Sequence, residues 1–185
     1  MTLLLAFLPF IAFVAIERLV GTLSGLIVAA LISVALLVRD RIRGMEVKIL
    51  ELGTSILFSA VTVWGLIEGV DSWSIAGVRL GIDLGLLVIV LTSLTVRQPF
   101  TLQYARAGVS AETASSPGFM RINNVITGVW AAAFAVMVMA DLLLLYRPDI
   151  PTRVAVFLTL AAAYGAFKFT NWYPVHAAAQ ARGAA

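Results

Sequence analysis

Cysteine is absent from this sequence, histidine occurs once, and charged residues make up only 12% of the 185 positions. Without cysteine there is no disulfide, no thiolate nucleophile and no thiolate metal ligand. The single histidine, His176, is too little for a bis-histidine haem or a typical catalytic zinc site. Soluble domains carry about 25% charged residues, so the low charge excludes a soluble globule. Disorder, which needs low hydrophobicity, is excluded as well.

What the sequence has instead is long apolar runs: 61% of its residues are hydrophobic and the mean hydropathy is +1.00. A membrane-spanning helix needs about 20 such residues. The runs predict an all-α integral membrane protein, with residues 1–185 forming one helical bundle of five full transmembrane helices and a short N-terminal membrane segment. The full spans are expected at about residues 19–38, 49–70, 78–96, 124–146 and 152–172.

The N-terminal segment, residues 3–16, is short for a full crossing and contains Pro9. It lacks the basic start and the small-residue cleavage site of a signal peptide. We expect a partial or re-entrant element, and a sixth span is the alternative.

The orientation follows from the Lys and Arg residues, which gather in cytoplasmic loops. The larger set lies between the second and third apolar segments, between the fourth and fifth, and in the tail: Arg39, Arg41, Arg43, Lys48, Arg97, Arg106, Arg121 and Arg182. These loops and the C-terminus are therefore predicted to be cytoplasmic. The net charge of +3 is attributed to this topology and not to nucleic-acid binding.

Ionisable residues inside or beside the spans are candidate functional groups because they are costly in a membrane. One set is expected at the outer ends of the helices and is the candidate binding cluster: Glu17, Arg18, Glu68, Arg79, Asp83, Asp141 and Arg147. Arg79 and Asp83 are four apart and share a helix face, whereas Glu68 and Asp141 need partners on other helices. The favoured interpretation is a structural network, and the alternative is a cavity for a polar solute, a lipid headgroup or protons.

Glycines at four-residue spacing let membrane helices approach closely. Gly77, Gly81 and Gly85 form the longest such row. They are predicted to serve in helix packing, either within one chain or between two copies in a homo-oligomer.

Residues 97–121 are predicted to form a cytoplasmic loop that begins with an interfacial helix. Pro99 suits a helix start, and Phe100 and Tyr104 would share one face. One or two turns are expected on the membrane surface, with Arg97 and Arg106 near lipid phosphates, or as a docking edge for a partner. Residues 108–118 are expected to be a flexible connection.

No nucleotide fingerprint, metalloprotease motif or nucleophile elbow is present, so neither catalytic residues nor a cofactor nor a metal site is predicted. One non-enzymatic alternative is a small transporter or channel that uses the outer ionisable cluster. Near the span centres, however, only uncharged polar residues are found: Ser59, Thr62 and Thr92. The other alternative is an accessory subunit of a larger membrane complex.

Several features together resemble the intracellular septation protein A family (YciB/IspZ). They are the Phe7-Leu8-Pro9 opening, the basic loop after the second apolar segment, Trp73 in an outer turn, Arg97-Gln98-Pro99 after the fourth segment, and Trp130-Ala131 early in the fifth. The resemblance implies a bacterial inner-membrane protein with about five spans and no enzymatic activity. It also implies a role in envelope maintenance and septation through division or wall-synthesis proteins.

Overall fold

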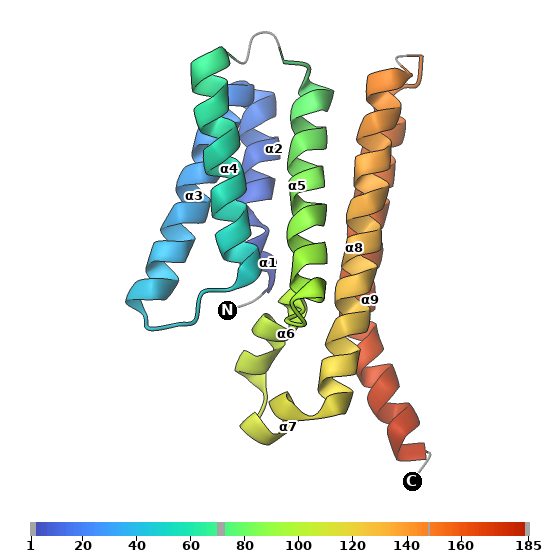
Figure 1. The fold of residues 1–185 in the computed structure, drawn as a ribbon. Helices are drawn as coiled ribbons and strands as arrows, with labels where there is room; N and C mark the ends of the chain where they lie inside the picture. The colour runs from blue at the N-terminus through green and yellow to red at the C-terminus, as the bar shows by residue number, and fades with distance from the viewer. Residues whose placement is uncertain (1–2, 70–72, 148, 184–185) are drawn as a thin grey trace. The chain divides into compact units, whose positions relative to one another are not determined.

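The computed structural model describes residues 3–69, 73–147 and 149–183, and over these residues the chain is helical without strands (Figure 1). The elements are α1 (Leu3–Ala6), α2 (Leu8–Leu19), α3 (Thr22–Ile42), α4 (Ile49–Glu68), α5 (Ile75–Thr95), α6 (Phe100–Ala105), the 3-10 turn η2 (Arg106–Gly108), α7 (Ala111–Ser115), α8 (Pro117–Tyr146) and α9 (Thr152–Gly183). The chain is an all-α membrane protein.

Five of these helices are long and apolar enough to cross a membrane: α3, α4, α5, α8 and α9. The prediction of five full spans is therefore confirmed. The N-terminal segment is broken at Phe7, and α2 has only 12 residues. At about 1.5 Å per residue, α2 is well short of the roughly 30 Å hydrocarbon core.

Two predicted loops are wrong. The basic stretch 39–43 is not a loop, because α3 continues through Ile42. Residues 108–118 are not an unstructured connection, because they contain α7 and the first turn of α8. Ser116 caps α8 by accepting a hydrogen bond from the Phe119 N–H, and Pro117 occupies the first turn. Ser-Pro is a typical helix start, so this boundary was readable in the sequence.

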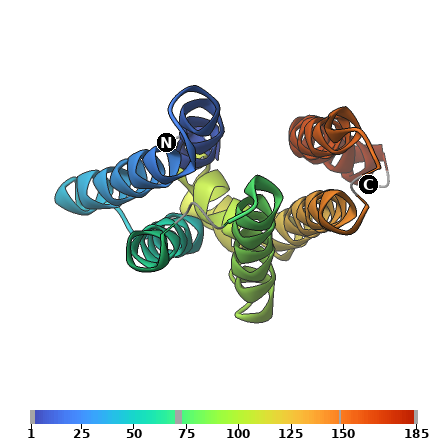
Figure 2. The ribbon, with the colours of Figure 1, turned by 90° about the horizontal axis from the view of Figure 1, so that it is seen from above.

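The chain forms two compact units, Met1–Ile89 and Val90–Ala185, whose boundary lies inside α5. In the first unit α3 lies beside both α2 and α4 (Figure 2). Its core contains Phe13, Leu26, Ala29, Phe58, Val78 and Ile82. In the second unit α8 and α9 form an antiparallel pair, and α6 and α7 pack on α8 (Figure 1).

Glycines set the helix spacing inside the first unit. A Cβ on Gly25 would lie 3.0 Å from the backbone oxygen of Phe13, so α2 and α3 touch through their backbones. A Cβ on Gly85 would lie 2.5 Å from the Leu57 side chain of α4. Gly81, one turn earlier on α5, is exposed and has no described atom within 4 Å of that position. Of the predicted glycine row, Gly85 therefore packs within the chain, whereas Gly81 faces open space.

Candidate functional site

One predicted pair of the outer ionisable cluster joins two helices of the first unit. Arg79, near the start of α5, donates from Nη2 to Oε2 of Glu17 on α2 at 2.9 Å. The Glu17 side chain is only 3% exposed. Because the two residues are 62 positions apart, the contact fastens the short α2 to a full membrane span. Asp83, expected to be the partner of Arg79, lies half-buried one turn further along α5.

The other members of the cluster are placed separately. Arg18 and Glu68 are exposed, at the ends of α2 and α4. Asp141 is buried in α8, in the second unit. Arg147 does not reach across helices; it binds the neighbouring Asp149 through both Nε and Nη2, at 3.1 and 3.0 Å. The two grooves on α4 described below are lined by neither Glu17 nor Arg79.

The Arg147–Asp149 pair lies between α8 and α9, and its hydrogen bonds lower the pKa of the Asp149 carboxyl below its usual 3.8. Replacing Arg147 with Gln should raise that pKa back towards 3.8, which a carboxyl-carbon NMR titration would measure. Because the pKa is depressed in the folded chain, the pair stabilises the fold above pH 3.8 and the stabilisation disappears in more acidic solution. Both side chains are more than half exposed, so this stabilisation is small. An Asp149 pKa that is identical in the variant and in the wild type would contradict the assignment.

A second ionic cluster, which the sequence did not reveal, lies at the opposite end of α3 and α4. Asp40 is 1% exposed and accepts from Arg39 Nη2 at 2.7 Å and from Lys48 Nζ at 3.4 Å. Lys48 also donates to Glu51 Oε1 at 3.1 Å. Asp40 lies close to the C-terminus of α3, and Lys48 is the residue directly before the first turn of α4. The helix dipole disfavours a negative charge at the first place and a positive charge at the second. Their pairing compensates both placements and fixes the α3–α4 turn.

Buried hydroxyls continue from this cluster along the inner face of α4. Thr54, Ser55 and Thr62 are 1%, 5% and 8% exposed. Their hydroxyl oxygens have no hydrogen-bond partner among the described residues. The ring of Phe58, fully buried with Phe10 and Phe13 around it, lies on α4 between Thr54 and Thr62. The hydroxyls therefore do not form a continuous polar path.

In the second unit, the predicted interfacial helix exists but is buried. Phe100 and Tyr104 of α6 are 0% and 8% exposed, and the Phe100 ring meets Trp130 of α8 edge-on. The prediction that this face lies on the membrane surface is wrong for these two residues. Arg97 and Arg106, at either end, are exposed as expected.

Hydrogen bonds explain why α6 packs against protein. Thr101 Oγ1 contacts the Asn123 carbonyl at 3.1 Å and Thr127 Oγ1 at 2.8 Å, and all three residues are buried. Thr101 and Thr127 offer neutral hydroxyls, which are poor acid–base groups, so this arrangement anchors α6 and does not suggest a reaction.

The turn into α6 is a Schellman motif. The Arg97 and Gln98 N–H groups donate back to the Leu94 and Ser93 carbonyls, and Arg97 has a φ of 55°. Glycine is usual at this position, so Arg97 itself did not indicate this type of turn, although Pro99 marks the end of the helix nearby.

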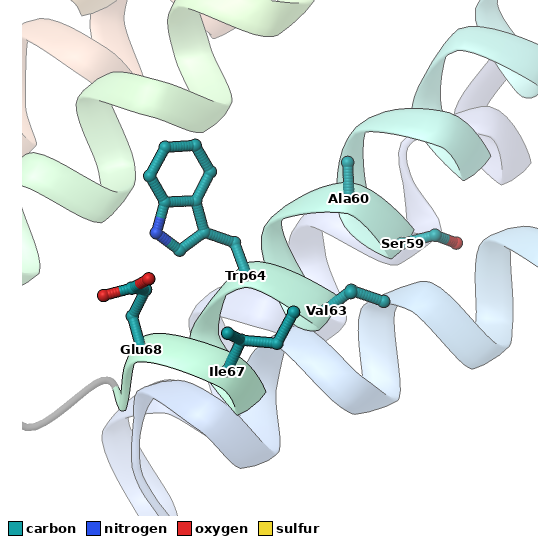
Figure 3. Close-up of a pocket in the computed structure, with 6 residues that line it drawn as sticks. All are labelled: Ser59, Ala60, Val63, Trp64, Ile67 and Glu68. Atoms are coloured by element: carbon teal, nitrogen blue, oxygen red, sulfur yellow. The ribbon is translucent and has the colours of Figure 1, made fainter.

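Two apolar grooves meet at Trp64 of α4. The first, about 530 Å³, is lined by Ser59, Ala60, Val63, Trp64, Ile67 and Glu68 (Figure 3). The second, about 450 Å³, lies between α4 and α5 and includes Trp64, Trp73, Gly77 and Gly81. A third, about 350 Å³, lies between α8 and α9 near Met139 and Leu158.

Among the described residues no group of three or more His, Cys, Asp or Glu side chains could hold a metal ion. In comparisons with known proteins, no protein-family model, no curated sequence and no solved structure matches this chain.

Proposed function

We propose that this chain is a non-enzymatic protein of the bacterial inner membrane that supports envelope maintenance and septation by binding other membrane proteins through its helices. Its C-terminus would lie in the cytoplasm, with the basic loops. The observation that carries the proposal is the groove between α4 and α5. Gly77 and Gly81 line it, and the position of a Gly81 Cβ is open.

Such a groove suits a transmembrane helix. Lipid tails are as apolar as leucine, so helices associate in membranes through close packing, and glycine lets two backbones approach. Trp64 and Trp73 lie beside the two glycines and offer large apolar contact areas. The resemblance to the septation protein A family supplies the class of partner: division or wall-synthesis proteins.

The ion pairs also support a scaffold. Glu17–Arg79 joins α2 to α5, and Lys48 joins the ends of α3 and α4. These charges stabilise the arrangement of the first unit, which holds the α4–α5 groove in shape.

The test is purification of the tagged chain from its native membrane in nanodiscs, with mass spectrometry of the proteins recovered. Gly81→Leu fills the groove and should reduce recovery of septal or wall-synthesis proteins about tenfold, a loss equivalent to about 1.4 kcal/mol of binding. Gly165→Leu is the matched control, because Gly165 on α9 is also exposed and open. Equal recovery with both variants would contradict the proposal. Recovery of a defined oligomer that carries only a small molecule would favour the transporter alternative.

A further inference from the structure

We propose that the groove on α4 binds a phospholipid whose headgroup carries a primary amine, with the ammonium held between the Glu68 carboxylate and the Trp64 indole. The site shares Trp64 with the α4–α5 groove of the septation proposal, but it centres on Glu68, which does not line that groove. It uses the first groove, which lies on α4 alone.

The groove has the length of one acyl chain. From Ser59 to Glu68 it follows α4 over nine residue steps, which amount to about 13.5 Å at 1.5 Å per residue. Half of a 30 Å hydrocarbon core is about 15 Å. Since Glu68 is the last residue of α4, the groove runs from one membrane surface to about the midplane. A single lipid leaflet has the same depth.

The walls of the groove are exposed. Val63, Trp64 and Ile67 are 54%, 64% and 75% exposed. Ser59 and Ala60, at the deep end, have small side chains, which leaves room for a chain terminus. The volume of about 530 Å³ suits a chain segment of lipid size.

The surface end of the groove has the chemistry of a cation site. Glu68 is exposed, and among residues 3–69, 73–147 and 149–183 no hydrogen bond or ion pair to it is seen. A carboxylate at a helix C-terminus is disfavoured by the helix dipole, which a bound cation would offset. Trp64 lies one turn before Glu68, and Figure 3 shows both side chains projecting from the same side of α4.

This pair of groups selects for a primary ammonium. The indole face attracts cations, and tryptophan is the strongest of the aromatic residues in doing so. The carboxylate accepts hydrogen bonds from an –NH₃⁺ group, which has three donors. An anionic glycerol headgroup would instead be repelled by Glu68. The groove should therefore prefer phosphatidylethanolamine to phosphatidylglycerol.

The experiment is native mass spectrometry of the full chain in detergent, titrated separately with palmitoyl-oleoyl phosphatidylethanolamine and palmitoyl-oleoyl phosphatidylglycerol. The wild type should bind the ethanolamine lipid about fivefold more tightly, and Glu68→Gln should abolish this preference. Glu68→Asp keeps the negative charge and should retain part of the preference for the ethanolamine lipid. Glu112→Gln, which neutralises an exposed acid on α7, should leave the preference unchanged.

Trp64 lines both grooves, so a Trp64 variant could affect either one. A second measurement therefore tests whether the lipid lies beside Trp64. Brominated phosphatidylethanolamine should quench the tryptophan fluorescence of the wild type more than that of Trp64→Phe. Trp172 is an exposed tryptophan of α9, and Trp172→Phe should leave the quenching as strong as in the wild type. Equal affinity of the wild type for the two lipids would overturn the proposal, as would a preference that survives Glu68→Gln. Co-purification of a protein cross-linked at Glu68 that excludes the lipid would also overturn it.

Discussion

Replacing Lys48 with Met should lower the free energy of unfolding by about 3–5 kcal/mol, the cost of removing one partner from a buried ion pair. Lys48 Nζ contacts both Asp40 and Glu51, which are 1% and 5% exposed. Its loss leaves two buried carboxylates with less compensating charge at the α3–α4 turn. Reversible unfolding in mixed micelles would measure the change.

The control variants distinguish the loss of the Lys48 ion pairs from the loss of a positive charge at this turn. Arg43→Met removes an exposed cation from the same turn and should change the free energy of unfolding by no more than about 0.5 kcal/mol. Lys48→Met combined with Glu51→Leu should recover part of the loss, since the pair is removed together. Equal effects of Lys48→Met and Arg43→Met would mean that water and lipid headgroups solvate the cluster.

The spans could be predicted from the sequence because hydrophobic length is a one-dimensional property. Apolar runs of about 20 residues recur, and five of them form the long helices. The ends of these helices were harder to predict, because a charged residue does not necessarily end a helix. Asp40 was expected in a loop but lies inside α3, where Arg39 and Lys48 neutralise it.

The contacts between segments could not be predicted, because pairing depends on tertiary packing. The i,i+4 spacing drew attention to Arg79 and Asp83, but Arg79 contacts Glu17, far away in the sequence. Tyr104 and Phe100 were expected on the membrane surface for a similar reason. Amphipathic periodicity shows which residues share a face; it does not show whether lipid or another helix covers that face.

The short N-terminal segment should depend on one aromatic ring for its position. Phe58 of α4 is fully buried, and its ring centroid lies 4.9 Å from that of Phe10 and 6.0 Å from that of Phe13, both on α2. Phe58→Ala should lower the free energy of unfolding by about 3 kcal/mol. This is the low end of the range for soluble proteins, because lipid solvates apolar groups and mainly packing is lost.

Loosening of α1 and α2 gives a second readout, because the chain has no cysteine and one added thiol is unique. Ala6 is 3% exposed, so a cysteine introduced there as Ala6→Cys should react slowly with a water-soluble maleimide. In the Phe58→Ala background it should react faster, since α2 loses its contact with α4. Phe157→Ala, which removes a 69% exposed ring from α9, should change neither the stability nor the labelling. Slow labelling that persists with Phe58→Ala would mean that the Glu17–Arg79 ion pair and the Gly25 contact are enough to hold the segment in place.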